Sequence, residues 1–207
     1  MKKSFCLLIS FVFGLAAAFA QAPPAEEPPV WEFNPDVSFY FLPDDFFVLP
    51  VFIADKNKLH LEARYNYEDR ETFSGWVGYN ISGGKKLEYT ITPMVGGVVG
   101  LTDGLAPGLE FTFTYGRFEL YNEMEYVFDV ESEENNYFYS WSDFTFAPKD
   151  WLWFGISGQR TRVYQTDVDY QRGLLIGVGL KAWELNTYFF NIDTDDPFIM
   201  INLSVGF

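Results

Sequence analysis

Hydrophobic and polar residues alternate along most of this chain, in runs that are separated by turn-forming residues. Successive side chains of a β-strand point to opposite faces, so a period of two predicts strands, whereas a helix would scatter the same residues around its axis. The clearest run covers residues 58–67. It places Leu59, Leu61, Ala63, Tyr65 and Tyr67 on one face, and His60, Glu62, Arg64 and Asn66 on the other.

The same alternation predicts ten strands from residue 58 onward: 58–67, 72–81, 87–97, 107–115, 118–128, 137–146, 151–164, 173–180, 184–191 and 198–207. Two further runs, 37–42 and 46–53, would make twelve. Pro50 and the shortness of the first run weaken this pair, although proline is tolerated near strand ends and edges. We predict twelve antiparallel strands, with ten strands and an N-terminal flap as the alternative.

The connections between these strands fall into two sets that alternate along the chain. Short turns carry or flank the lysines that follow residue 20: Lys56, Lys58, Lys85, Lys86, Lys149 and Lys181. Longer connections at 68–71, 101–106, 129–136, 165–171 and 193–197 hold the acidic clusters. Hairpins that place every second connection at the same end explain this segregation. Short turns at one end and longer loops at the other are typical of an up-and-down transmembrane β-barrel.

Tryptophans strengthen the membrane interpretation. Trp151 and Trp153 follow one short turn, and Trp183 follows another. Amphipathic rings gather at the headgroup level of a bilayer, so these three predict part of an aromatic belt. A pI near 4.3 speaks against a nucleic-acid partner, because the chain has too few basic groups to neutralise a row of phosphates.

The first residues predict export. Lys2 and Lys3 precede an apolar run, and Ala18-Phe19-Ala20 has the form of a cleavage site, so residues 1–20 are interpreted as a signal peptide cleaved after Ala20. The single cysteine, Cys6, would leave with it. Residues 21–36, which begin with the proline-rich stretch QAPPAEEPP, are interpreted as a periplasmic linker, and residues 37–207 as the barrel.

A signal peptide, a cysteine-free acidic chain, amphipathic strands and a terminal phenylalanine together resemble small Gram-negative outer-membrane β-barrel proteins. The stretch Ile201–Phe207 is similar to the C-terminal signal by which such barrels reach their assembly machinery. The resemblance implies an outer-membrane location, with Phe207 as the assembly signal. It also implies contact with outer-membrane lipids, lipopolysaccharide and the assembly machinery, but it carries no activity across.

One histidine provides the candidate for catalysis. Barrel hydrolases of the lipid A deacylase and phospholipase kinds place a His and a Ser two residues apart on one strand, but here Glu62 follows His60 at that spacing. Ser74 on the next strand is a further candidate partner. The alternative is a structural histidine that hydrogen-bonds to Glu62, Arg64 and Asn66. We expect no enzymatic activity and no cofactor, and keep a lipid-modifying hydrolase that uses His60 as an alternative.

The inward faces of the predicted strands are rich in carboxylates. The expected lumen-lining residues are His60, Glu62, Arg64, Asn66, Glu88, Glu110, Glu119, Glu123, Glu125 and Asp143, with Arg160 or Arg162 as further cations. Such a lumen is either a water-filled pore that favours cations or a packed polar plug. Bulky inward residues favour filling: Trp76, Tyr121, Tyr139 and Trp141. The leading hypothesis is a structural role or passive diffusion of small solutes and cations.

The acidic loops offer a third possibility, a surface-interaction barrel. Carboxylates that could collect divalent cations are Asp129, Glu131, Glu133, Asp193, Asp195 and Asp196. None of these loops has the spacing and glycine of an EF-hand. Solvated surface charge that keeps the loops in water is the simpler interpretation.

Overall fold

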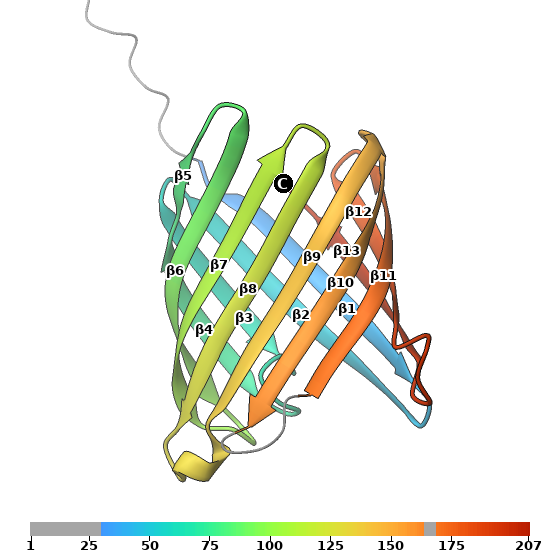
Figure 1. Ribbon diagram of the computed structural model, residues 1–207. Helices are drawn as coiled ribbons and strands as arrows, with labels where there is room; N and C mark the ends of the chain where they lie inside the picture. The colour runs from blue at the N-terminus through green and yellow to red at the C-terminus, as the bar shows by residue number, and fades with distance from the viewer. Residues whose placement is uncertain (1–29, 164–168) are drawn as a thin grey trace, which may run out of the picture.

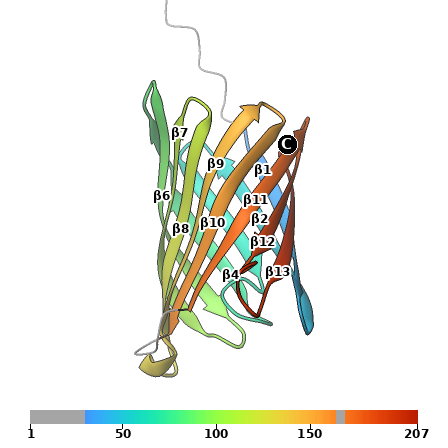
Figure 2. The ribbon, with the colours of Figure 1, turned by 45° about the vertical axis from the view of Figure 1, so that its right-hand side comes forward.

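The computed structural model describes residues 30–163 and 169–207. The predicted signal peptide, its cleavage site and residues 21–29 of the predicted linker lie outside the described residues. The described chain forms one antiparallel sheet that closes into a barrel (Figures 1 and 2). No helix in this part of the chain is long and apolar enough to span a membrane.

The barrel is built from neighbours in sequence: each strand pairs with the next, except that β4 pairs with β6. The elements are β1 (Glu32–Leu42), β2 (Asp45–Lys56), β3 (Leu59–Tyr65), β4 (Phe73–Tyr79), β5 (Ile81–Gly83), β6 (Leu87–Val99), β7 (Gly104–Tyr115), β8 (Phe118–Asp129), the 3₁₀ turn η1 (Glu133–Asn135), β9 (Tyr137–Lys149), β10 (Leu152–Val163), β11 (Asp169–Leu180), β12 (Trp183–Phe190) and β13 (Phe198–Val205).

Twelve strands close the ring, which confirms the predicted fold class. The closure joins β1 to β13, and β4 to β6. The short β5 follows β4 after Asn80 and pairs with the same neighbour, β6, so it is an extra segment beyond the ring of twelve. The alternative of ten strands and a flap is wrong, because β1 pairs with β13 from Asp36 to Phe41 and β2 pairs with β3.

The first strand begins earlier than the sequence pattern indicates. β1 starts at Glu32, so residues 32–36, which were assigned to the linker, belong to the barrel. Pro35 obscures the alternation there, but the stretch has partners on both sides: Glu32 lies opposite Asp55 of β2, and Phe33 exchanges two backbone hydrogen bonds, of 2.8 and 3.0 Å, with Phe207. The terminal phenylalanine therefore helps to close the barrel; its role as an assembly signal remains a prediction.

The two kinds of connection lie at opposite ends of the barrel. The hairpin turns that carry the lysines lie at the end where the C-terminus lies, at the top of Figure 1, and we call this the short-turn end. The loops that include η1 lie at the other, long-loop end. Two loops are shorter than predicted, because β7 begins at Gly104 and β11 at Asp169.

Side chains alternate between the lumen and an apolar outer surface. Large apolar residues are exposed around the whole outer face, as expected for strands in contact with lipid. Trp151 and Trp183 are more than half exposed near the short-turn end. Trp153 departs from the predicted belt: it points inward, donates a hydrogen bond to Asn186 Oδ1 at 2.8 Å, and lies over Gly177 of β11.

Candidate functional site

Strand β3 carries three charged residues into the lumen. His60, Glu62 and Arg64 are 5%, 6% and 1% exposed, because alternate residues of this strand face inward. The outward residues between them are apolar or aromatic. The period-two pattern that predicts a strand here also places these three residues on one face, and all three are buried in the structure.

Arg64 crosses the lumen and joins β3 to β8. Its Nε donates to Glu62 Oε2 at 2.5 Å, and its Nη1 donates to Glu123 Oε1 at 2.6 Å and to Glu125 Oε2 at 3.3 Å. The guanidinium also lies against two aromatic rings, 4.4 Å from the centroid of Tyr67 and 4.7 Å from that of Trp76. Full burial is tolerable for this cation because both charge partners and aromatic faces surround it.

Carboxylates outnumber cations around this residue. Six carboxylates lie within 4.0 Å of the Arg64 guanidinium or the His60 ring: Asp55, Glu62, Glu68, Glu110, Glu123 and Glu125. We call these eight residues the lumen charge cluster. Buried charge must be paired, hydrated or neutralised by a proton or a bound cation. Two fully buried oxygens of the cluster, Glu68 Oε2 and Glu125 Oε1, have no hydrogen-bond partner among the described residues.

The sequence pattern did not predict that Tyr67 and Glu68 lie in this region, because the alternation breaks at Asn66. That residue has a left-handed backbone, with φ of 59°, and lies in a turn after β3. The break turns Tyr67 inward, where its hydroxyl donates to Glu123 Oε2 at 2.6 Å. Glu68, assigned from sequence to an acidic outer loop, is buried and accepts from Ser74 Oγ at 2.5 Å. Asn66 itself does not line the lumen; its amide donates to the Val48 carbonyl at 2.9 Å.

His60 is held by carboxylates on both ring nitrogens. Nδ1 lies 2.8 Å from Asp55 Oδ1, and Nε2 lies 2.7 Å from Glu62 Oε1. Ser74 is not its neighbour: in the β3–β4 register Ser74 lies opposite Arg64, whereas His60 lies opposite Gly78. Four positions along a strand correspond to roughly 13 Å. The predicted approach of Ser74 to His60 is therefore wrong.

A cavity of about 600 Å³ occupies the half of the lumen toward the short-turn end. Its walls reach from Gly116 and Asp150, beside the short turns, to Glu62 and Arg64 in the lumen charge cluster. Further carboxylates along the walls are Asp36, Glu110, Glu119, Glu123, Asp143 and Glu184. Asp36 is a lining residue that the sequence did not predict, because residues 21–36 were interpreted as a linker. Asp143 accepts a hydrogen bond from the Tyr188 hydroxyl at 2.9 Å.

Apolar side chains form two clusters in the lumen. One contains Tyr40, Leu49, Val51, Trp141, Leu175, Tyr188, Phe190, Phe198 and Met200, and all of these but Phe190 and Phe198 also line the cavity. The other contains Trp76, Met94, Val98, Ala106, Val127 and Tyr137. Tyr139 packs against both clusters and also lines the cavity, so it lies where the open and filled parts of the lumen meet. The lumen thus holds both a cavity with carboxylates among its lining residues and clusters of packed apolar side chains.

Two predicted lumen positions have a different place, and a third is not described. Glu88 is exposed near the short-turn end of β6 and is not among the residues that line the cavity. Arg160 is exposed and lies over the ring of Phe138, 5.9 Å from its centroid. The side chain of Arg162 lies outside the described part of the chain.

The acidic loop residues have local roles. Asp129 Oδ1 accepts backbone N–H groups of Glu131 at 2.9 Å and Ser132 at 2.8 Å, so it caps the turn that leads into η1. Asp193 pairs with Arg172 at 2.5 Å, and this hydrogen bond lowers the pKa of the Asp193 carboxyl. The remaining candidates are exposed: Glu131, Glu133, Asp195 and Asp196.

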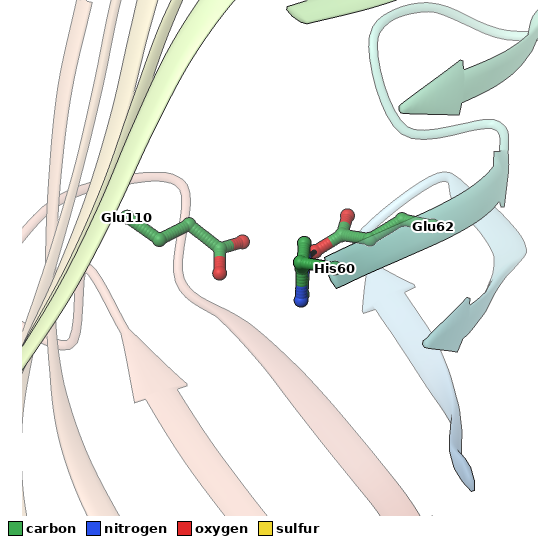
Figure 3. A group of neighbouring side chains, drawn as sticks. All are labelled: His60, Glu62 and Glu110. Carbon is green, nitrogen blue, oxygen red and sulfur yellow. Dashed lines mark hydrogen bonds and ion pairs between the residues drawn. The ribbon is translucent and has the colours of Figure 1, made fainter. Parts of the chain in front are cut away.

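The residues that could hold a metal are instead in the lumen. Within the described ranges, one group of three such side chains has ligand atoms within 4.8 Å of one another: His60, Glu62 and Glu110. Figure 3 shows Glu110 extending from the opposite side of the lumen, with its carboxylate directed toward the other two. These three belong to strands that are not neighbours in the sheet, β3 and β7.

Comparisons with known proteins identify the architecture. No protein-family model matches the sequence, and no curated protein matches it. Among solved structures, the KdgM porin is similar with a TM-score of 0.60 and 10% identity, over 84% of this chain and 99% of the porin. The same porin in complex with disordered oligogalacturonate gives 0.62 and 9%, with the same coverage.

A second solved structure, Acinetobacter baumannii Omp33, is similar with a TM-score of 0.52 and 13% identity, over 87% of this chain and 99% of Omp33. At such identities the likeness concerns the fold. It extends over nearly the full length of both neighbours, and it agrees with the twelve-stranded closure and the apolar outer surface. The chain therefore has the fold of a small, porin-like outer-membrane β-barrel protein.

Proposed function

We propose that this protein is an integral outer-membrane barrel through which small cations or small uncharged solutes diffuse passively. The observation that carries the proposal is the cavity of about 600 Å³, which leads from the short-turn end to the lumen charge cluster. Carboxylates along such a path attract cations and repel anions. The fold shared with the KdgM porin supports a diffusion role.

The charge of the lumen argues for a solute class different from that of this neighbour. The KdgM porin has been solved in complex with oligogalacturonate, a chain of sugar acids. Here the cavity walls carry carboxylates from strands β1, β3, β7, β8, β9 and β12, which outnumber the lining cations Arg64 and Arg117, so an acidic sugar would meet net repulsion. Cations and uncharged molecules fit this lining.

We expect a constriction at the inner end of the cavity. Any solute that leaves the cavity toward the long-loop end meets Arg64, which is bonded to Glu123, and Tyr67, which is bonded to the same carboxylate. Tyr139 lies beside them and packs edge-on against the Tyr67 ring, with centroids 5.7 Å apart. We therefore expect a small single-channel conductance. It should correspond to a narrow path that ions cross with few accompanying water molecules, and not to a wide pore.

Conductance of the refolded barrel in a planar bilayer under a KCl gradient tests the proposal. Reproducible small steps with a cation-favouring reversal potential are expected. The double variant Glu119→Gln, Glu184→Gln removes two carboxylates that line the cavity but lie outside the lumen charge cluster, and it should shift the reversal potential toward zero selectivity. Asp195→Asn, on an exposed loop at the opposite end, is the matched control. Anion selectivity would contradict the acidic path.

A structural barrel without transport is the second candidate, and the two apolar clusters in the lumen favour it. A silent bilayer, with folding shown by heat-modifiable gel mobility, would support this role over diffusion. Binding of a surface partner through the acidic loops remains a prediction, which deletion of residues 129–136 followed by a cell-surface binding assay would test. Unchanged lipid A and phospholipid in a His60→Ala strain would exclude a hydrolase that uses His60.

A further inference from the structure

We propose that His60, Glu62 and Glu110 form a binding site for one divalent transition-metal ion, with Zn²⁺ as the best match. One imidazole nitrogen and two carboxylate oxygens are a donor set that suits Zn²⁺, and water can complete its four-coordinate shell. Binding of the ion inside the lumen does not depend on whether the barrel conducts.

The existing contacts already select the donor atoms. His60 Nδ1 is turned to Asp55 Oδ1 at 2.8 Å, which leaves Nε2 as the metal ligand. Nε2 lies 2.7 Å from Glu62 Oε1, so the ion would replace the proton that these two atoms share. A carboxylate on the far nitrogen of a ligating histidine fixes its tautomer and increases its basicity, and Asp55 has this position. Asn80 Nδ2 in turn donates to Asp55 Oδ1 at 2.7 Å.

Glu110 is the ligand most free to move. Its Oε1 has a long hydrogen bond from the Tyr121 hydroxyl, at 3.4 Å, and an ion pair with Arg64 at 3.6 Å. Neither contact involves Oε2, which is left to bind the ion. The ligand atoms of the three residues already lie within 4.8 Å of one another, whereas ligands of a tetrahedral Zn²⁺ are roughly 3.4 Å apart. A rotation of the flexible Glu110 side chain closes this difference, and His60 Nε2 and Glu62 Oε1, now 2.7 Å apart, would separate slightly to admit the ion.

A glycine on the intervening strand allows close packing beside His60. His60 faces Gly78 of β4, and a Cβ atom at Gly78 would lie 3.2 Å from the His60 ring, 2.9 Å from a Thr92 methyl group and 3.0 Å from the Met94 Cβ, both on β6. Thr92 and Met94 therefore occupy the room that a side chain at position 78 would need. Thr92 lies opposite Glu110 in the β6–β7 pairing, which brings Glu110 toward His60 although two strands lie between β3 and β7 in the sheet.

The surrounding charge favours a cation. The lumen charge cluster has six carboxylates, with Arg64 as its permanently charged base and His60 as the other cation when protonated. A divalent ion that displaces the His60 proton lowers the negative excess further. Glu62 and Glu110 both line the cavity that extends to the short-turn end, so an ion can enter from that side.

Isothermal titration of the metal-free, refolded full-length barrel with ZnCl₂ tests the site. We expect one tight equivalent per chain. Glu110→Gln should weaken binding by at least tenfold and still fold, because Glu110 makes only the two long contacts above. Glu134→Gln removes an exposed carboxylate of η1, at the long-loop end, and should bind Zn²⁺ as the parent does. Equal affinity in Glu110→Gln, or the absence of a stoichiometric event in the folded parent, would overturn the proposal.

Two further measurements separate a built site from loose attraction to negative charge. Co²⁺ bound through His60 should give visible d–d absorption bands that Zn²⁺ removes by competition and that His60→Gln abolishes. Asp55→Asn should weaken Zn²⁺ binding by roughly ten- to a hundredfold, as loss of the carboxylate behind a ligating histidine does. Bands that persist in His60→Gln would place the metal elsewhere and contradict the assignment. Mobility on heat-modifiable gels confirms that each variant is folded.

The result is distinguishable from that of the proposed function. Zn²⁺ binding by a barrel that is silent in the bilayer would keep the metal site and exclude diffusion. The opposite result is a conducting barrel that shows no stoichiometric Zn²⁺ binding and whose conductance does not change when Zn²⁺ is added to the chamber facing the short-turn end. It would support diffusion and exclude the metal site.

Discussion

Arg64 is the residue on which the interior of this barrel most depends. It is 1% exposed, and its guanidinium contacts carboxylates from both β3 and β8. Removal of one partner from a buried ion network leaves the others uncompensated, at a cost of about 3–5 kcal/mol. We expect Arg64→Met to reduce the free energy of unfolding by this amount, measured by urea unfolding in lipid vesicles.

The matched control is Arg70→Met. Arg70 pairs with Asp45, but both side chains are nearly half exposed, at 46% and 48%, and such surface pairs contribute about 0–1 kcal/mol. Equal losses in the free energy of unfolding for the two variants would contradict the prediction that the buried Arg64 network contributes more than a surface ion pair.

The sequence shows which residues of a regular strand meet inside, but not where side chains point after the strand is interrupted. His60, Glu62 and Arg64 were predicted correctly because they share one face of β3. Tyr67 and Glu68 were not, because the left-handed Asn66 reverses the alternation, and asparagine adopts that conformation only in some contexts. Pairing between residues 59 positions apart, such as Arg64 and Glu123, requires knowledge of the barrel closure.

At the scale of elements, small residues on some strands make room for large side chains from others. The Trp76 ring of β4 lies over Gly96 of β6, where an added Cβ would come within 2.4 Å of the indole. Gly97, the next residue along the chain, faces outward with no atom within 4 Å of its Cβ position. Two adjacent glycines on one strand thus differ in what surrounds them.

Gly96→Ala is expected to lower stability by about 1–3 kcal/mol, as overpacking of a filled interior does. Gly97→Ala should change the stability by a few tenths of a kcal/mol at most, because the methyl group enters open space on the outer face. Urea unfolding midpoints of the two variants give the comparison. A larger loss in Gly97→Ala would mean that the strand itself, and not the indole, requires glycine.

The number and order of the strands were predictable, since alternation and turn residues repeat along the whole barrel. The residues at which the strands begin and end were less predictable. Pro35 hid the first five residues of β1, whose place depends on pairing with β2 and on the hydrogen bonds between Phe33 and Phe207. Contacts of this kind join the two ends of the described chain, and a local pattern carries no information about them.

At the scale of the whole molecule, the lumen combines a cavity with packed apolar side chains. Carboxylates and apolar side chains share the cavity walls, which reach the short turns, whereas no member of the cluster that contains Trp76 and Val98 lines the cavity. The alternation pattern assigns inward positions but not their depth, so the sequence left pore and plug as alternatives. Under the proposed diffusion role, we expect this arrangement to place the barrier to permeation between the cavity and the cluster that contains Trp76, rather than in the cavity or the loops.

Tyr139 tests this arrangement, because it packs against both apolar clusters and borders the cavity. Tyr139→Ala should connect the cavity to the long-loop side and increase single-channel conductance over that of the parent in planar bilayers. Tyr126→Ala removes the same ring from the outer face of β8, where it packs on Phe128, and should leave conductance unchanged. An increase in both variants would indicate a general loosening of the barrel. An increase in Tyr139→Ala alone would locate the barrier at the inner end of the cavity, where Arg64 and Tyr67 are hydrogen-bonded to Glu123.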